Sequence, residues 1–196
     1  ELAYEQRCGR DFSVSDIEAI RKVIVSDFVP VYMSYMADSV DMDLVDKAFD
    51  QNDDPADVKL ENLGKCLAAV SPAFDESFEY LQRNGLSDIG MSDKKTSSSS
   101  GFVLECPSYN DGVLFVSPYG ETTDYLSVVH EFGHFNHMYH AQANAFLPNS
   151  LPDVQESMSQ SLELLCCDSY DRLCPGYGKA LAQYAVLDKM FMVRDS

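Results

Sequence analysis

Two histidines four residues apart, His130 and His134, are the residues whose types and spacing most directly suggest chemistry. On an α-helix, side chains at this spacing lie on one face, so both rings can direct a nitrogen at one point. Such a point suits a divalent metal ion. Glu131 is rotated about 100° from His130, so its carboxylate lies beside the metal and can take a proton from water. The segment 130–134 therefore predicts the centre of a zinc hydrolase site.

The alternative is that these histidines are only a surface pair on an amphipathic helix. Two features favour the metal site. Thr122 and Thr123 offer N-caps about two turns upstream, which places both histidines in the middle of a helix. The neighbouring side chains are apolar or small, as expected for a buried helix: Ser127, Val128, Val129, Phe132 and Phe135.

A hydrolytic zinc site usually has three protein ligands, so a third ligand must be found. His140 gives the outer spacing of the metzincins, but their segment turns at a glycine three residues before its last histidine. Here that position is His137. If the helix continues, His140 points about 80° away from His130 and lies roughly 15 Å along the axis. We therefore expect the third ligand elsewhere.

Glu156 is the better candidate for the third ligand. Pro152 and Asp153 are typical of a helix start, and the connection over residues 141–151 lets a second helix return antiparallel. A glutamate from that helix would complete the two-histidine, one-glutamate zinc site of metalloproteases. Gln160 and Glu163 lie on nearly the same face, where they either orient the ligands or simply form a polar helix surface.

The motif His130-Glu131-Phe132-Gly133-His134, followed by Glu156, Ser159, Gln160 and Glu163 at their spacing, resembles the zinc site of the oligoendopeptidase F and thimet oligopeptidase family. The segments 101–104 and 112–119 and the turn Gly120-Glu121-Thr122 resemble the strands and turn that lead into the family's zinc helix. The resemblance implies a zinc-dependent endopeptidase acting on oligopeptides, with Zn²⁺ on His130, His134 and Glu156 and with Glu131 as the catalytic base.

One departure from the family concerns the end of the chain. In the family, a later helical segment carries histidine and tyrosine side chains that stabilise the tetrahedral intermediate, whereas all four histidines here lie between residues 130 and 140. The chain also begins at Glu1 and ends at Ser196. We expect a partial catalytic domain whose partner is the missing remainder. A catalytically silent zinc-binding fragment and a helical interaction module remain alternatives.

Composition excludes several other classes of protein. The formal net charge of -18 and the absence of a basic stripe argue against nucleic acid as a partner. No stretch is apolar enough to span a bilayer, so we expect no membrane partner. A cytoplasmic location is expected from the pattern of the cysteines. The six cysteines are scattered, which is typical of reduced core residues: Cys8, Cys66, Cys106, Cys166, Cys167 and Cys174.

The elements that must position the site are mainly helical. Apolar periodicity and caps predict helices over 12–36, 41–49, 55–69, 72–83 and 179–193, the first with a capping box at Ser15–Glu18 and a break or kink at Pro30. Strands 101–105 and 113–116 predict a small antiparallel β-hairpin beside the zinc helix.

We divide the chain into a helical part (1–90), a polar loop (91–100) and a zinc-binding part (101–196). The hairpin in the last part either pairs with an extended peptide along its edge or is only structural.

Overall fold

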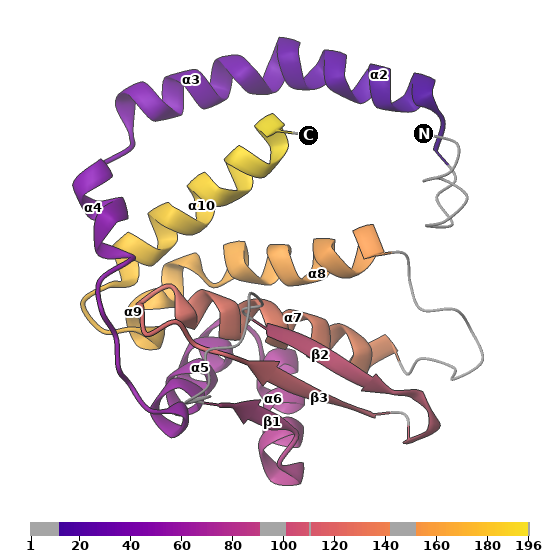
Figure 1. Ribbon diagram of the computed structural model, residues 1–196, viewed down its shortest axis with the longest axis vertical. Coiled ribbons are helices and arrows are strands. Elements are labelled where there is room, and N and C mark those ends of the chain that lie inside the picture. The colour runs from indigo at the N-terminus through magenta and orange to yellow at the C-terminus, as the bar shows by residue number, and fades with distance from the viewer. Residues whose placement is uncertain (1–11, 91–100, 110, 142–151, 196) are drawn as a thin grey trace. The chain divides into compact units, whose positions relative to one another are not determined.

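The computed structural model describes residues 12–90, 101–109, 111–141 and 152–195 (Figure 1). Within these ranges the chain is mainly helical and carries one small sheet, which confirms the predicted fold class. The chain forms two compact units, one of residues 1–42 and 186–196 and the other of residues 43–185. The polar loop 91–100 lies outside the described residues, and the division at that loop stays a prediction.

The first unit contains one long helical run and the end of the last helix. Its elements are α2 (Val14–Val23), a π-helical turn (Ile24–Phe28), α3 (Val29–Asp38) and the end of α10 (Gly178–Asp195). At Pro30 the run continues through a widened turn, in which the N–H of Val29 donates to the carbonyl of Ile24. Because proline has no N–H to donate, the hydrogen-bond pattern must change near it.

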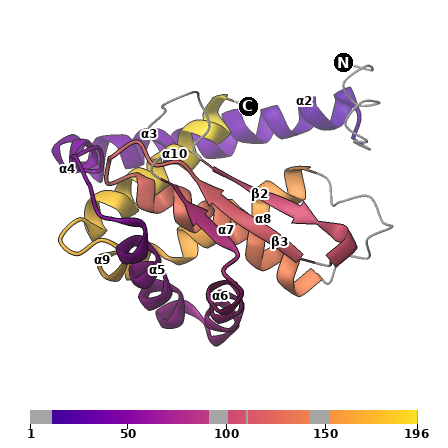
Figure 2. The same cartoon turned by 60° about the horizontal axis from the view of Figure 1, so that its bottom comes forward.

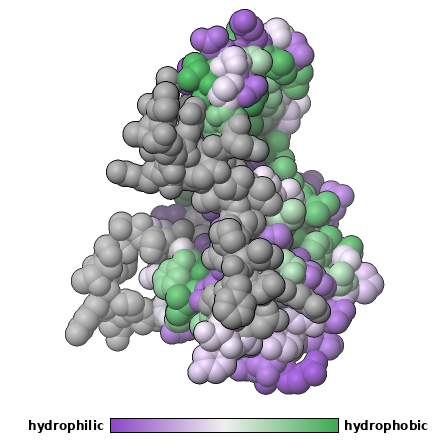
Figure 3. Space-filling model, turned by 90° about the vertical axis from the view of Figure 1, so that its right-hand side faces the viewer, coloured by the Kyte–Doolittle hydropathy of each residue, from purple (hydrophilic) through white to green (hydrophobic). Residues whose placement is uncertain are grey.

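The capping box of this run lies two residues earlier than predicted. The N–H of Ser13 donates to Asp16 Oδ2 at 2.7 Å, and the N–H of Asp16 donates to Ser13 Oγ at 3.4 Å. The prediction at Ser15 was wrong because both serines have an acidic residue three positions later, and the pattern alone does not choose between them. The top of Figure 3 shows apolar and polar surface side by side. The exposed large apolar side chains of the run are Val14, Ile20, Val23, Val25, Val31 and Met33.

The second unit holds most of the helices and the sheet. The helices are α4 (Met42–Lys47), α5 (Ala56–Val70), α6 (Pro72–Asn84), α7 (Asp124–Ala141), α8 (Pro152–Leu165), α9 (Tyr170–Leu173) and the start of α10. The predicted limits of α6 are confirmed by its caps. The hydroxyl of Ser71 accepts the N–H of Ala73 at 3.2 Å, and Gly85 ends the helix in the left-handed conformation with φ 63°.

The sheet contains the predicted hairpin and one further strand. It consists of β1 (Ser87–Ile89), β2 (Gly101–Cys106) and β3 (Asp111–Val116) in the order β1-β3-β2. β2 pairs antiparallel with β3, whereas β1 pairs parallel with it. At three residues, β1 is too short to show a periodic pattern in the sequence. The mixed sheet therefore extends the prediction, and among the described residues β2 lies at its edge.

Helix α7 packs against this sheet and against α8, α5 and α6, so it forms the centre of the second unit (Figure 2). Its fully buried side chains include Tyr125, Val128, Val129, Phe132 and Phe135. Leu114 and Val116 of β3 are buried with them. The helix expected to carry the zinc ligands is thus fixed on several sides.

Two sequence-level expectations concern the whole chain. In the described ranges, no helix is both long and apolar enough to cross a membrane. The cysteines in those ranges are free thiols: Cys66, Cys106, Cys166, Cys167 and Cys174. Cys8 lies outside the described residues.

Candidate metal centre

The side chains of His130, His134 and Glu156 converge on one point between α7 and α8. The Nε2 atoms of His130 and His134 are 3.2 Å apart. Glu156 Oε2 lies 3.4 Å from His130 Nε2, and Glu156 Oε1 lies 3.6 Å from His134 Nε2. One ligand atom from each residue falls within 4.8 Å of the others. The structure therefore brings together the three residues that the sequence selects as metal ligands.

This spacing fits a zinc ion. Two donors held about 2.0–2.1 Å from one zinc ion at a tetrahedral angle are roughly 3.3–3.4 Å apart. The separations of His130 Nε2 from His134 Nε2, 3.2 Å, and from Glu156 Oε2, 3.4 Å, lie close to that value, and the other carboxylate oxygen, Oε1, lies 3.6 Å from His134 Nε2. Two imidazoles and one carboxylate are also a donor set typical of catalytic zinc, which leaves a fourth position open. The side chain of Glu156 is 50% exposed, so solvent can reach that position.

Glu163 holds the ring of His130 in a defined orientation. Its Oε1 atom lies 2.7 Å from His130 Nδ1 and accepts a hydrogen bond from that nitrogen when it carries the proton. The Nε2 atom, directed at Glu156, is then left free as a metal donor. Burial opposes a charge on His130, but the hydrogen bond and the charge of Glu163 outweigh it and raise the pKa of the ring.

The packing around Glu163 is itself specific. Glu163 is buried at 4% exposure, and the hydroxyl of Tyr170 donates a hydrogen bond to its backbone carbonyl. The structure thus favours the orienting role over the polar-surface alternative for Glu163. In the described part of the chain, the hydrogen bonds and ion pairs of the two histidines do not include Gln160.

Glu131 is buried beside the cluster with one oxygen unpartnered. Its side chain is 6% exposed, and Oε2 has no hydrogen-bond partner among the described residues. Burial raises the pKa of Glu131 to about 7, the attraction of His130 opposes the rise, and the charges of Glu156 and Glu163 add to it. Such a group can exchange a proton near neutral pH, as a general base must.

Gly101 allows Glu131 to occupy this place. A Cβ atom on Gly101 would lie 2.6 Å from Cγ and 2.9 Å from Oε1 of Glu131, closer than real Cβ contacts allow. It would also lie 2.9 Å from the carbonyl oxygen of Phe115. The first residue of β2 therefore lies directly on the glutamate of α7. No local pattern in the sequence indicates this contact, because 30 residues separate the two positions.

A second glycine brings together the two helices that carry the candidate ligands. A Cβ atom on Gly133 would lie 2.5 Å from the Cα atom of Ser159 in α8. Ser159 is fully buried, and its hydroxyl donates to the backbone carbonyl of Glu156 at 3.0 Å. Close contact at these two small residues thus sets the distance between the histidines and Glu156.

The N-terminal end of α7 is anchored by polar contacts to the segment before α5. The N–H of Asn52 donates to the carbonyl of Gly120 at 2.8 Å, and the N–H of Thr122 donates to the carbonyl of Asp50 at 2.9 Å. The hydroxyl of Thr122, expected to cap the helix, donates to that same Asp50 carbonyl at 3.1 Å. Asp124 instead accepts the N–H groups of the preceding turn: Tyr119, Gly120 and Glu121.

The remaining histidines lie apart from the cluster. Helix α7 continues without a break to Ala141, as expected when His137 replaces the metzincin glycine. His140 is exposed, and its Nε2 lies 3.4 Å from the carbonyl of Ala73. The metal-type cluster in the described residues does not include His137 or His140.

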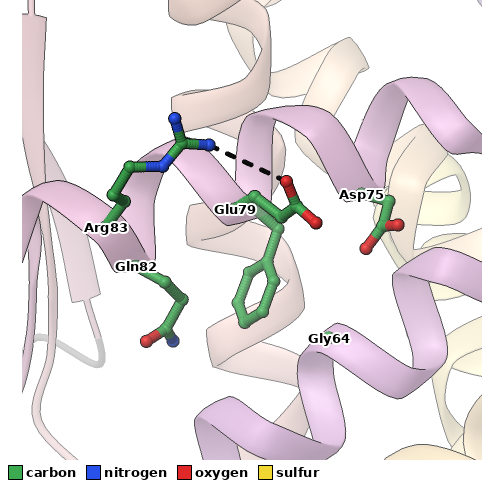
Figure 4. A pocket seen from close by; sticks show the side chains of 6 residues that line it. Gly64, Asp75, Glu79, Gln82 and Arg83 are labelled. Atoms are coloured by element: carbon green, nitrogen blue, oxygen red, sulfur yellow. Dashed lines mark ion pairs between the residues drawn. The ribbon is translucent and has the colours of Figure 1, made fainter.

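A hollow of about 460 Å³ lies between α5 and α6 (Figure 4). Its lining includes Gly64, Asp75 and Gln82. Glu79 and Arg83 also line it and form an ion pair, with 3.7 Å between Glu79 Oε2 and Arg83 Nη2. None of the residues that line it belongs to the cluster of histidines and glutamates. The hollow is therefore separate from the candidate metal centre.

Comparison with known proteins supports the fold. No protein-family model and no curated protein matches the chain. Among solved structures, it is similar to an oligoendopeptidase F (TM-score 0.71, 17% identity, 97% of this chain and 35% of that one). It is also similar to PZ peptidase A with an inhibitor (0.69, 18%, 96% and 35%) and to an oligoendopeptidase F from Bacillus anthracis (0.70, 17%, 96% and 37%). The chain therefore has the fold of these peptidases over about a third of their length.

Proposed function

We propose that this chain carries the zinc site of a metalloendopeptidase that hydrolyses oligopeptides in the cytoplasm. The observation that carries the proposal is the convergence of His130, His134 and Glu156 beside a buried, unpartnered Glu131 oxygen. The similarity to peptidase structures supports the same class of reaction. Because the chain spans about a third of those structures, the activity, substrates and location of the whole protein are part of the proposal.

In this proposal, His130, His134 and Glu156 hold Zn²⁺, and Glu163 fixes the ring of His130. When bound, zinc would act as a Lewis acid that polarises the carbonyl group of the cleaved bond and lowers the pKa of water. Glu131 accepts the proton of the attacking water on its buried carboxylate and then donates it to the leaving amine. A pKa near neutrality suits both steps, because the group must gain and lose the proton in one cycle.

The edge of β2 is the proposed site for the peptide backbone. In the described part of the chain, β2 pairs only with β3, so its other edge can pair with an extended peptide through main-chain hydrogen bonds. Gly101, at one end of β2, lies against Glu131. Further along, Glu105 Oε1 accepts a hydrogen bond at 3.4 Å from Gln155, the neighbour of Glu156. A peptide on this edge would pass the metal ligands.

Metal content and hydrolysis test the two halves of the proposal separately. Purified protein should contain about one zinc per chain by elemental analysis, and His130→Ala should lose it. Glu131→Gln should keep zinc and lose hydrolysis of a quenched fluorescent peptide. Tyr109→Ala, which changes a side chain that is 83% exposed, serves as the control and should alter neither property.

Each alternative gives a different result. A catalytically silent zinc-binding fragment would retain zinc and cleave no peptide, even when Glu131 is intact. A helical interaction module would bind zinc weakly, and His130→Ala would not change its zinc content. Cleavage by Glu131→Gln at the parental rate would exclude the proposed role of Glu131.

A further inference from the structure

The outer face of the sheet carries an apolar surface that the metal site does not use. Side chains alternate along β2, so Gly101 and Val103 face α7 while Phe102 and Leu104 face outward. Phe102 and Leu104 are each 51% exposed. Edge strands usually carry charged residues, which prevent unwanted pairing. Two large exposed apolar side chains on the edge strand of a protein with a net charge of -18 are therefore unusual and indicate a binding surface.

The register of the strands places these side chains in rows. Phe102 lies opposite Phe115, and Phe115 lies opposite Asp88 on β1. The rings of Phe102 and Phe115 are stacked, with centroids 4.9 Å apart and planes at 22°. In the next row, Leu104 lies opposite Val113. A strand added at the edge of β2 would continue both rows, and its outward side chains would lie beside Phe102 and Leu104.

This surface is continuous with the candidate metal centre. A hollow of about 200 Å³ lies at one end of the sheet and is lined by Asp88, Gly90, Gly101, Phe102, Phe115, Val116 and Ser117. Gly101 contributes to this hollow and also lies against Glu131. A peptide residue opposite Phe102 would thus lie within one or two residues of the bond next to Glu131.

We propose that Phe102 and Leu104 select peptides with an aromatic or large aliphatic side chain next to the cleaved bond. The inference rests on the proposed function, since it takes the edge of β2 as the peptide site. An aromatic peptide side chain would extend the stacked pair of Phe102 and Phe115 and remove their exposed surface from water. An alanine at that position would leave the surface exposed.

Binding can test this selection without cleavage. We would use zinc-loaded Glu131→Gln protein and fluorescein-labelled octapeptides of alanine and serine, each with one phenylalanine at a successive position. Fluorescence anisotropy should identify one or two positions at which phenylalanine lowers Kd by roughly three- to tenfold, the range expected for aromatic pairs. Adding Phe102→Ala should abolish that preference and leave the affinity for the all-alanine and serine peptide within twofold.

Two further variants separate selection from folding. Phe102→Leu keeps a large apolar side chain and should retain most of the preference. Tyr109→Ala removes an exposed aromatic side chain from the same hairpin and should retain all of it. Thermal melting of each variant should match the parent protein.

Several outcomes would overturn the inference: no position at which phenylalanine improves binding, a preference that survives Phe102→Ala, or an equal loss of affinity for every peptide. The proposed function is tested by other readouts, namely zinc content and cleavage by the protein with Glu131 intact. A preference that depends on Phe102 in a protein that cleaves nothing would support the peptide surface and refute the peptidase activity.

Discussion

Glu163 Oε1 lies 2.7 Å from His130 Nδ1, although the two residues come from different helices. This contact joins α8 to α7 at the candidate metal centre, in addition to the contacts of Glu156 with both histidines. Its two partners differ in exposure, since the Glu163 side chain is 5% exposed and that of His130 is 24% exposed. The orientation of the His130 ring is therefore set from the buried side of the site.

Replacing Glu163 should weaken zinc binding without removing a ligand. Glu163→Ala leaves the Nδ1 atom of His130 without its acceptor, so we expect zinc affinity to fall by about 10- to 100-fold. Glu163→Gln keeps an acceptor oxygen and should lose less. Competition with a fluorescent chelator measures both values. Gln160→Ala, on the same helix, is the control, and a loss as large as that of Glu163→Ala would argue against a specific role for Glu163.

Replacing Gly101 should affect hydrolysis more than metal binding. In Gly101→Ala, the new methyl group would overlap Glu131 and the carbonyl of Phe115, so the glutamate must leave its present position. We expect kcat to fall by at least tenfold while zinc content stays at the parental level. In Gly90→Ala, the new methyl group meets only the carboxylate of Asp88, at 3.2 Å, and activity should persist. Loss of zinc in Gly101→Ala would indicate a wider structural change.

The residues that the sequence predicts best are those set by local periodicity. His130 and His134 share a face because they are one turn apart, and the expected antiparallel return of α8 places Glu156 opposite them. The residues that complete the site depend on contacts between elements. No periodic pattern in the sequence indicates the contact of Gly101 with Glu131. From the sequence alone, a glycine that is required at a strand end looks the same as one that is not.

The fold differs from the prediction where local patterns were ambiguous or where distant segments pair. The capping box lies at Ser13 and not at Ser15, because two overlapping sequence patterns match a capping box equally well. The helical run does not end at Pro30, because a π-helical turn at Ile24–Phe28 precedes it and the proline stands in the first turn of α3, where a missing N–H is tolerated. β1 was not predicted, because its pairing with β3 is parallel and joins segments distant in the sequence.

Replacing Gly133 should destabilise the contact between α7 and α8. In Gly133→Ala, the methyl group would meet the backbone of Ser159, which cannot rotate away as a side chain can, so the helices must separate. We expect the free energy of unfolding to fall by about 1–3 kcal/mol and zinc affinity to fall with it. Urea unfolding and chelator competition measure the two effects. Ser161→Ala, on the exposed side of α8, should change stability by less than about 0.5 kcal/mol.

Replacing Tyr125 should change stability in a pH-dependent way. The hydroxyl of Tyr125 donates to Asp54 Oδ2 at 2.8 Å, and this bond is the largest of the causes that lower the pKa of Asp54 in the folded chain. A lowered pKa means that the folded state favours the ionised carboxylate. The stabilisation is therefore present above the pKa of the unfolded chain, about 3.9, and is lost as the pH falls through the folded value.

Tyr125→Phe removes the donor but nearly conserves the buried volume, so the hydrogen bond should dominate the effect. We expect the free energy of unfolding to fall by about 1–2 kcal/mol at pH 7. The difference between variant and parent should begin to shrink below about pH 4, because the unfolded chain then protonates Asp54 whereas the folded parent does so only at its lowered pKa. Urea unfolding between pH 3 and 7 gives this profile, with Tyr109→Phe as an exposed control. A difference that stays constant across this range would mean that Tyr125 stabilises the fold through packing and its contact with Asn62 Nδ2, which donates to the hydroxyl at 3.4 Å, and not through the charge of Asp54.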